Sequence, residues 1–440
     1  MTPHVCFYGD DFTGAAENLA QFHRHGLRSR LYFEPADHAR VRKEAADLDV
    51  VGIAGVARSC APDKMRELLE DAFSLFASLK APLNQYKVCS TFDSAPEVGN
   101  FAVAIETARR YWPDACAPVL AATPDFGRYT AFSNLFSAHR QEILRLDRNP
   151  ALTNHPSTPM TEADLRRHLH ALGTPPPGAI MLPELASGAD AVADLLDQRG
   201  ADGAPVVLDA VDNAQLRVVC AAMWRLAARR SVFCVGAQGF PQGIGGLIAA
   251  ELGRAPAESS GKTSPPGPAL VLSGSCAEQT GVQLSAVEAA GWEMISLPPS
   301  EVRAPEDVGR IAERAAPLML EALARGRSVA AFTARGAATE PFDPARAERV
   351  GQILAALFRE AAKKAGVRQV IFAGGDSSSY AMRNSGAYAL EIAAFYGLHS
   401  SNVCRLLADD EVDGVNVVLK GGQAGDDDFF LRPLGEPTRH

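Results

Sequence analysis

The feature that most restricts the fold of this chain is the alternation of short apolar, β-branched runs with longer segments rich in Ala, Leu, Arg and Glu. Strands buried on both faces and separated by helices form parallel sheets joined by crossover helices. The alternation continues through most of the 440 residues, a length sufficient for two or three domains with separate cores. The sequence therefore predicts an α/β protein with mostly parallel sheets flanked by helices.

A stretch of small, polar and proline residues, 254–268, is typical of a linker. We therefore expect one domain at 1–253 and a second at 269–440, with a ligand cleft between them. Residues 124–159 show little periodicity and are predicted to be an irregular segment. Strands are expected at 50–54, 86–90, 118–122, 179–182, 205–209, 232–235, 269–272, 294–297, 329–332, 370–373 and 415–419, and helices at 63–79, 98–111, 161–172 and 213–229.

Two adjacent carboxylates, Asp10 and Asp11, follow a predicted buried strand at residues 5–8 and precede a predicted helix at 15–25. In an open α/β sheet, ligands bind at the carboxyl ends of the strands. Paired acids at that place are suited to hold a metal or a polyol hydroxyl, or to accept a proton. The alternative is that Asp10 ends the strand while Asp11 or Thr13 caps the helix.

Basic residues follow other predicted strands of the first half. Arg58 lies just past the second strand, Lys87 lies in the third, and Arg128 opens the irregular segment. Each could bind a carboxylate, although a single basic residue is more often a surface charge. His155 lies beside a proline and is either a proton-transfer residue or a structural one.

Three predicted strands of the second half run into turns of small residues, at 273–275, 374–379 and 420–425. Glycines let backbone N–H groups approach a ligand, and a following helix N-terminus adds a positive dipole end. Together the turns predict a phosphate cradle for a nucleotide, in which Lys420 supplies a charge. Asp426, Asp427 and Asp428 are either a solvated turn or a magnesium site.

Two further motifs resemble nucleotide-binding loops and are rejected. Residues 261–263 read Gly-Lys-Thr, but Pro256 stands where a phosphate loop requires glycine, and no strand leads into the segment. Residues 235–239 lack the first G-x-G step of a dinucleotide fingerprint. We expect a linker at the first place and a tight turn or domain contact at the second.

The composition excludes several classes of protein. A net charge of −9 and a pI near 5.6 argue against nucleic acid as a partner, although a local basic pocket can still bind a small anion. The eight scattered cysteines indicate reduced thiols. No signal peptide and no apolar run of the roughly 20 residues that a membrane helix requires is evident. We expect a cytoplasmic protein without a membrane partner; the oligomeric state stays open, with a homodimer among the alternatives.

Taken together, these motifs resemble those of the four-carbon acid sugar kinase family over nearly the full length. Asp10 and Asp11 match the opening D-D-x-T-G-A, and Arg58 lies in an S-R-like element. Residues 273–280, 374–377 and 420–425 resemble the family's G-S-x-x-x-x-T, G-G-E-T and K-x-G-x-F-G motifs. The resemblance implies a sugar-acid-binding N-terminal domain, an ATP-binding C-terminal domain, and phosphorylation of a sugar-acid hydroxyl with ATP and Mg²⁺.

The resemblance also implies roles for individual residues. Asp11 or Asp10 would orient the accepting hydroxyl and receive its proton. No metal ligand is assigned. The sugar acid would be bound by Asp11, Arg58, Lys87, Val88, Cys89 and Ser90, and ATP by Ser273, Gly274, Ser275, Gly374, Gly375, Asp376, Ser377, Lys420 and Gly422.

Two differences from the family's usual K-x-D-S-T-L-R-G change charge. Cys89 replaces the aspartate and Asp93 replaces the arginine, which alters the charge of the expected sugar-acid pocket. A sugar-acid-binding protein that has lost catalysis is therefore an alternative. An NAD(P)-dependent sugar-acid oxidoreductase is a further alternative, which the missing dinucleotide fingerprint disfavours.

Overall fold

The structure is a computed structural model that describes residues 2–139, 142–153, 158–257, 267–336, 343–395 and 402–432. Contacts divide the chain into two compact units. The N-terminal unit comprises Met1–Asp10, Gln21–Ser29 and Pro35–Ala257, and the C-terminal unit comprises Asp11–Ala20, Arg30–Glu34 and Glu258–His440. Most of the expected linker, including residues 261–263, lies outside the described residues, as does His155.

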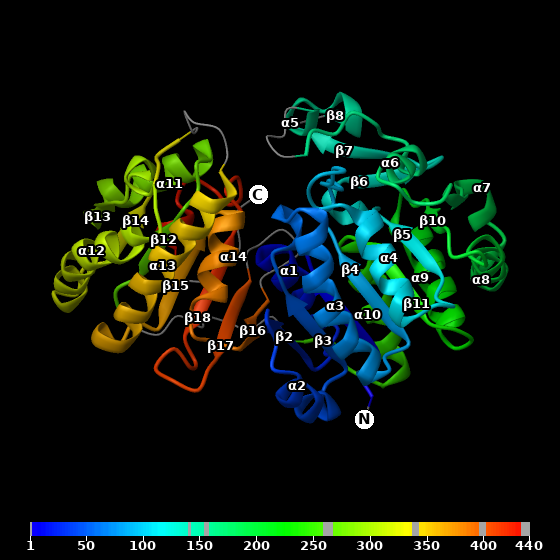
Figure 1. The fold of residues 1–440 in the computed structure, drawn as a ribbon, viewed down its shortest axis with the longest axis horizontal. Coiled ribbons are helices and arrows are strands. Elements are labelled where there is room, and N and C mark those ends of the chain that lie inside the picture. Colours follow the sequence, from blue (N-terminus) through cyan, green and yellow to red (C-terminus); the bar gives the residue numbers. More distant parts are fainter. Residues whose placement is uncertain are drawn as a thin grey trace. The chain divides into compact units, whose positions relative to one another are not determined.

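The N-terminal unit is built on a parallel sheet with the strand order β3-β1-β4-β11-β5-β10-β9. Helices pack around this sheet (Figure 1), with α3 against α4, and α9 against both α8 and α10. Strand β1 is buried along its whole length, as expected for a parallel strand covered on both faces. The strands are β1 (Val5–Gly9), β3 (Val50–Ala54), β4 (Leu83–Lys87), β5 (Ala117–Leu120), β9 (Gly178–Ile180), β10 (Pro205–Leu208) and β11 (Val232–Gly236).

Several helices of this unit begin directly after a residue whose side chain caps them. Helix α4 starts three residues later than expected because the Asn100 side chain accepts a hydrogen bond from the Ala102 N–H (2.8 Å). Helix α6 starts four residues late because Asp164 accepts from the Arg166 N–H (3.0 Å). The helices are α2 (His38–Glu44), α3 (Pro62–Leu79), α4 (Phe101–Tyr111), α5 (Pro150–Thr153), α6 (Leu165–Ala171), α7 (Leu182–Leu185), α8 (Gly188–Arg199), α9 (Asn213–Ala227) and α10 (Gly239–Glu251), and α1 (Phe12–His23) is divided between the two units.

Strand β4 lies three residues before its predicted position. Its register is fixed on both sides, by Leu83 opposite Val5 of β1 and by Leu83 opposite Val232 of β11. The start of the strand was not predicted because Asn84 and Gln85 are polar residues that interrupt the apolar run, yet both are buried. The Gln85 side chain donates a hydrogen bond to the Gly236 carbonyl (2.9 Å). As a result Lys87 is the last residue of β4, and the residues after it form a loop.

The prediction of an irregular segment at 124–159 is wrong for much of its length. Strands β6 (Arg128–Ala131), β7 (Asn134–His139) and β8 (Glu142–Arg145) form a small antiparallel sheet (Figure 1). Phe132 and Ser133, both at positive φ, make the turn between β6 and β7. The buried Asp209 carboxylate accepts their backbone N–H groups, at 2.6 and 2.9 Å, and so holds this turn.

The C-terminal unit has the strand order β13-β14-β12-β15-β18-β17-β16-β2. The first five strands are parallel, and β17, β16 and β2 are antiparallel additions. The strands are β2 (Ser29–Phe33), β12 (Leu270–Ser273), β13 (Glu293–Ser296), β14 (Val329–Phe332), β15 (Gln369–Ala373), β16 (Ala389–Ala394), β17 (Val403–Leu407) and β18 (Asn416–Lys420). The helices are α11 (Glu278–Ala289), α12 (Glu306–Ala324), α13 (Pro344–Ala365) and α14 (Gly375–Arg383).

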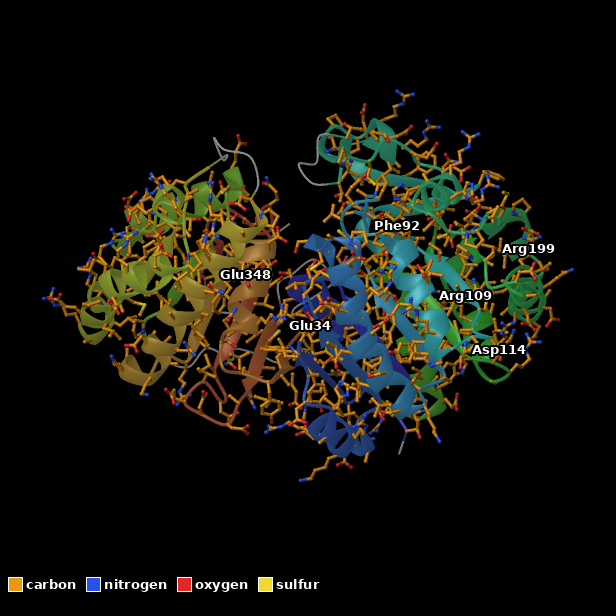
Figure 2. The ribbon with its side chains drawn as sticks, in the orientation of Figure 1. Glu34, Phe92, Arg109, Asp114, Arg199 and Glu348 are labelled. Atoms are coloured by element: carbon orange, nitrogen blue, oxygen red, sulfur yellow. The ribbon has the colours of Figure 1, made fainter. Side chains whose placement is uncertain are left out.

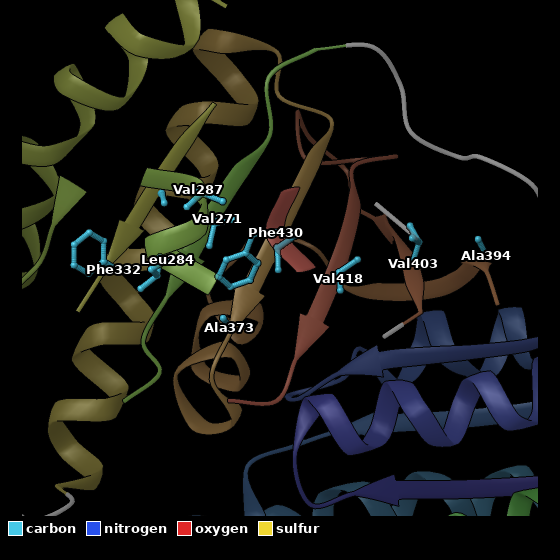
Figure 3. Packing of buried hydrophobic residues seen from close by; sticks show 11 residues of the cluster. Val271, Leu284, Val287, Phe332, Ala373, Ala394, Val403, Val418 and Phe430 are labelled. Atoms are coloured by element: carbon cyan, nitrogen blue, oxygen red, sulfur yellow. The ribbon is translucent and has the colours of Figure 1, made fainter. Parts of the chain in front are cut away.

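A buried hydrophobic cluster holds one face of this sheet against α11 and the chain's last described segment (Figure 3). Val271, Ile371 and Val418 supply it from neighbouring strands, Leu284 from α11, and Phe430 closes it. The predicted α/β architecture with mostly parallel sheets is confirmed in both units.

All eight cysteines are free thiols. In the described part of the chain no helix is long and apolar enough to cross a membrane.

Candidate functional site

In the N-terminal unit, backbone hydrogen bonds tie together the ends of three neighbouring strands. The Asp10 N–H donates to the Lys87 carbonyl (3.1 Å), and the Arg58 N–H donates to the Asp10 carbonyl (3.1 Å). The chain segments that follow β1, β3 and β4 are therefore held side by side at the carboxyl edge of the sheet. This edge brings Asp10, Arg58 and Lys87 together, as the sequence predicted.

Asp10 and Arg58 form a buried bidentate ion pair. Nε and Nη2 of Arg58 donate to the two carboxylate oxygens of Asp10 at 3.1 and 2.7 Å, and the Asp10 side chain is 1% exposed. The Arg58 backbone is held from the other side by Gly99, where an added Cβ would lie 2.7 Å from the Arg58 carbonyl oxygen. The guanidinium that sequence reasoning assigned to the sugar acid is thus engaged by Asp10 in this structure.

Asp11 caps helix α1. Its Oδ1 accepts a hydrogen bond from the Gly14 N–H, and its carbonyl accepts from the Ala15 N–H (3.0 Å). The next residue, Phe12, donates its N–H to the Ser379 Oγ on α14 (3.2 Å). The capping alternative therefore holds for Asp11, whose side chain is buried.

Lys87 is fully buried, and its ammonium has no hydrogen-bond partner among the described residues. A buried, unpaired charge costs free energy of several kcal/mol on the order-of-magnitude scale. Such a group is retained where a ligand supplies the missing partner. Lys87 is thus the clearest sign of an anion site in this unit.

The loop after Lys87 carries further polar groups that face one another. Thr91 Oγ1 donates to Cys89 Sγ (2.8 Å). Burial, and next the Asp93 carboxylate, raise the pKa of the Cys89 thiol to about 11, while Arg58 and Lys87 oppose this. The thiol is therefore neutral at physiological pH. Because the charges of Asp93, Arg58 and Lys87 all act on the pKa of this thiol, these three residues lie near Cys89.

Arg128 and Asp93 complete this group. Burial lowers the pKa of the Arg128 guanidinium, and the nearby Cys89 and Asp93 oppose the shift. The Nε of Arg128 and the Oδ1 of Asp93 are both buried without a hydrogen-bond partner in the described part of the chain. Asp93 is thus itself positioned to accept a hydrogen bond. We call Lys87, Cys89, Asp93 and Arg128 the acid pocket.

His168 on α6 is a residue that sequence reasoning missed. Its Nε2 lies 2.7 Å from the Ser94 Oγ, and its ring contacts Phe92, labelled in Figure 2. Phe92 is at φ +61°, a strained conformation for a bulky residue. Burial lowers the pKa of His168 to about 4, so the ring is neutral and braces the loop. No sequence pattern linked this helix to that loop.

In the C-terminal unit, three predicted turns meet at the carboxyl ends of β12, β15 and β18. An added Cβ on Gly274 would lie 2.2 Å from Ser377 Oγ, and one on Gly422 would lie 2.8 Å from Ser275 Oγ. Gly374 is at φ +114°, so a side chain there would be strained, and helix α14 starts directly after it. We call residues 273–275, 374–377 and 420–422 the glycine turns.

Open space lies beside two residues of the glycine turns. An added Cβ on Gly375 or on Gly421 would meet no atom within 4 Å. Gly375 opens α14, whose acidic first-turn residue is Asp376. Backbone N–H groups at the start of a helix beside open space are suited to bind phosphate.

Lys420 lies at the centre of the glycine turns. Its fully buried ammonium donates to Thr280 Oγ1 (3.3 Å) and to the carbonyls of Gly421 (3.0 Å) and Gly422 (3.1 Å). It also lies 5.6 Å from the centre of the Phe430 ring. These partners are neutral, and burial lowers the pKa of Lys420 to about 8.

The segment that follows the third glycine turn, residues 424–426, is held in place by amide side chains of α11. The Gln283 Nε2 donates to the carbonyls of Ala424 and Asp426 at 3.0 and 2.8 Å, and Gln279 donates to the Gly425 carbonyl (2.9 Å). Asp426 and Asp428 pair with Arg432. Among the described residues no group of His, Cys, Asp or Glu is arranged to hold a metal ion by itself.

Comparison with known families matches both halves of the chain. Residues 5–244 match a family described as a sugar-binding N-terminal domain, and residues 270–430 match one described as a nucleotide-binding C-terminal domain. The chain belongs to the four-carbon acid sugar kinase family. The acid pocket falls in the matched sugar-binding region, and the glycine turns fall in the nucleotide-binding region.

The similar curated proteins of this family are kinases by name. The chain is 32% identical to a 3-oxo-isoapionate kinase of Paraburkholderia graminis, over 97% of this chain and 93% of the relative. It is 31% identical to a 3-oxo-tetronate kinase of Methylobacterium radiotolerans, over 97% of both.

Two solved structures share the fold. A Salmonella typhimurium LT2 protein is 22% identical with a TM-score of 0.72, covering 98% of both chains. A Haemophilus influenzae protein of family DUF1537 is 21% identical with a TM-score of 0.67, covering 97% of this chain and 98% of that one.

Proposed function

We propose that this protein is an ATP-dependent kinase that phosphorylates a hydroxyl of a small, four-carbon-type sugar acid. One observation carries the proposal most strongly: the sugar-binding region contains the fully buried, unpaired ammonium of Lys87. A carboxylate ligand would neutralise this charge. The names of the relatives, 3-oxo-isoapionate and 3-oxo-tetronate kinases, support an acid or oxo-acid acceptor.

The acid pocket supplies the contacts that such an acceptor needs. Lys87 and Arg128 would bind the carboxylate, because charge-assisted hydrogen bonds to ammonium and guanidinium groups are the strong ones. Asp93 would accept a hydrogen bond from a substrate hydroxyl. The neutral thiol of Cys89 would line the pocket without a charge, at the position where the resemblance implies a negatively charged aspartate in other members of the family. Val88 and Ser90 would contribute backbone or hydroxyl contacts.

Asp11 is the proposed general base for the accepting hydroxyl. Asp10 is held in a bidentate ion pair with Arg58, so its negative charge is largely compensated. Asp10 is therefore assigned to position Arg58 and the strand ends. Asp11 would orient the hydroxyl and receive its proton, a role that typically contributes about 10²–10⁴-fold in rate.

The glycine turns would bind the nucleotide. Gly375 and Gly421 border open space that phosphate groups could fill, and Lys420 would place its ammonium beside them. The hydroxyls of Ser273, Ser275 and Ser377 and the carboxylate of Asp376 complete the turns. Mg²⁺ usually binds through one or two carboxylates together with substrate phosphates, which agrees with an aspartate at this place and with no preformed metal cluster among the described residues. Bound there, Mg²⁺ would neutralise charge on the phosphates.

The oxidoreductase alternative is not favoured. Gly239, the last residue of the fingerprint-like turn at 235–239, serves the packing of α10 on the sheet. A Cβ on Gly239 would lie 2.1 Å from the Ala122 carbonyl oxygen, so glycine is required for close helix–strand approach. The turn has a structural reason that does not involve a dinucleotide.

A coupled assay of ADP release with Mg-ATP and a panel of four-carbon acids, including 3-oxo forms, tests the function. We expect acid-dependent ADP release. Asp11→Asn should lower kcat by at least about 100-fold and leave ADP affinity nearly unchanged. Lys87→Met should raise KM for the acid but not for ATP, with the exposed Lys64→Met as the matched control. Release of ADP at the same rate without any acid would refute the proposal.

A further inference from the structure

A second basic site lies in the C-terminal unit and is lined by none of the residues assigned above. It is a cavity of about 340 Å³ whose described lining includes Ser300, Arg303, Asp343, Arg346 and Arg349. Pro299 adds an apolar wall. Arg346 and Arg349 lie in the first two turns of α13, and Ser300 and Arg303 follow β13. We call this cavity the arginine pocket.

The arginine pocket has an excess of positive charge. Three guanidiniums and one carboxylate line its described part. The carboxylate, Asp343, is the N-cap of α13 and accepts from the Ala345 N–H (3.0 Å). Its Oδ2 lies 3.8 Å from Arg346 Nε and 3.6 Å from Arg349 Nη2, longer than a normal hydrogen bond. Asp343 therefore makes no normal hydrogen bond to Arg349 in the described part of the chain.

Arg349 indicates that a partner is missing. Its Nε is buried, and the described residues offer it no hydrogen bond. The side chain is 16% exposed, so little solvent replaces that bond. The arginines also lie at the N-terminus of a 22-residue helix, whose dipole favours a negative charge at this end.

The first turns of α13 also support the glycine turns. The Val350 side chain lies against Gly274, where an added Cβ would be 3.1 Å from Val350 Cγ1. Gly351 packs on α14, since a Cβ there would lie 2.4 Å from Tyr380 Cβ. A shift of α13 at Arg349 would therefore reach the turn after β12 through Val350 and helix α14 through Gly351. Glu348, labelled in Figure 2, marks this part of the helix.

We propose that the arginine pocket binds a phosphate-bearing small molecule, with the phosphate held by Arg346 and Arg349. Arginine forks match phosphate geometry, and the volume suits a small metabolite rather than a macromolecule. Two sources share this chemistry: a separate phosphorylated metabolite that acts through α13 on the glycine turns, or a phosphate of the nucleotide itself.

The test uses the full-length protein and titrates it with inorganic phosphate and with glycerol 3-phosphate, by calorimetry and by thermal shift, with and without saturating ADP. We expect glycerol 3-phosphate to bind, and the Arg346→Gln/Arg349→Gln double variant to bind it at least about tenfold more weakly. Arg303→Gln, a change at an exposed position, repeats the test if the double variant unfolds. Arg325→Gln, which removes an exposed ion pair on α12, is the matched control and should bind as the wild type does.

The ADP arm identifies the source. Binding of glycerol 3-phosphate that persists in saturating ADP supports a separate metabolite site. Competition by ADP, together with weaker ADP binding by the double variant, supports the nucleotide as the source. Unchanged phosphate binding in both the double variant and Arg303→Gln overturns the proposal. None of these readouts depends on turnover, so they stand apart from failure of the kinase assay.

Discussion

The ammonium of Lys420 should give nucleotide binding a pH dependence in the weakly alkaline range. Burial among neutral partners lowers its pKa from 10.5 to about 8. At 1.36 kcal/mol per pKa unit, this corresponds to roughly 3 kcal/mol against the charged form. Lys420 is therefore charged in the free protein at neutral pH and loses its proton as the pH rises through 8.

A neutral amine attracts phosphate far less than an ammonium does. A hydrogen bond to a charged group contributes about 1.5–3 kcal/mol, so KM for ATP should rise by roughly 10- to 150-fold once Lys420 is fully deprotonated. In the wild type, kcat/KM for ATP should be constant below about pH 7 and fall above about pH 8. Bound phosphate favours the charged form, so the break in kcat should come at higher pH than the break in kcat/KM.

Two variants separate this charge from other titrating groups. Lys420→Met should have a high KM for ATP at every pH and no break near pH 8. Lys420→Arg keeps its charge throughout, so its profile should be flat there even if altered geometry raises KM.

The same group should affect stability. The unfolded chain binds this proton up to about pH 10.5 and the folded chain only up to about 8, so the wild type should gain stability between these values relative to Lys420→Met. A wild-type profile of kcat/KM for ATP that is flat from pH 6 to 9.5, or a break near pH 8 that survives in Lys420→Met, would refute the reasoning.

Three further predictions concern the rest of the chain. Gly55→Ala should destabilise the protein by about 1–3 kcal/mol, because the new Cβ would lie 1.9 Å from the Tyr8 hydroxyl. Gly309→Ala in α12 should stabilise it by up to about 1 kcal/mol, because the new Cβ meets no atom within 4 Å. Urea denaturation measures both changes, and equal effects would contradict the packing argument. Arg58→Ala should cost about 3 kcal/mol because it removes the guanidinium fork from the buried Asp10 carboxylate. The double change with Asp10→Asn should recover stability but not turnover, and a lack of such recovery counts against the ion pair. Burial lowers the pKa of His168 from 6.5 to about 4, so between these values the unfolded chain binds a proton that the folded chain does not, and stability should fall by about 1–2 kcal/mol from pH 7 to 5. His168→Asn should lessen this fall, measured by urea titration at each pH. An unaltered fall would disprove that His168 is buried and neutral in the folded protein.

The alternation of strands and helices was readable from sequence because it rests on local burial patterns. Residues 50–54 and 329–332 coincide with β3 and β14. The prediction was wrong at β4, whose buried Asn84 and Gln85 break the apolar pattern. It also failed at β6 to β8, where short antiparallel strands are specified by pairing with one another and by the Asp209 carboxylate, 64 or more residues away in the sequence. Local pattern carries no information on such contacts.

For the candidate site too, features that depend on local sequence pattern were predicted, and contacts between distant residues were not. Lys87 and Lys420 were predicted to lie near the carboxyl edge of a sheet, where parallel strands end. The partners of these residues were not. The fork between Arg58 and Asp10 and the contact of His168 with Ser94 join residues 48 and 74 positions apart.

The adjacent aspartates that suggested a site are, in the structure, each compensated by the fold. The guanidinium of Arg58 compensates the charge of Asp10, and the Asp11 carboxylate caps the N-terminus of α1. Their burial can therefore be explained by the fold and does not by itself require a substrate. The same cannot be said of Lys87, whose buried ammonium has no hydrogen-bond partner among the described residues, since protein folding alone does not favour an unpaired charge. The functional inference for the N-terminal unit consequently depends more on this lysine than on either aspartate, and Lys87→Met tests it more directly than any change at Asp10.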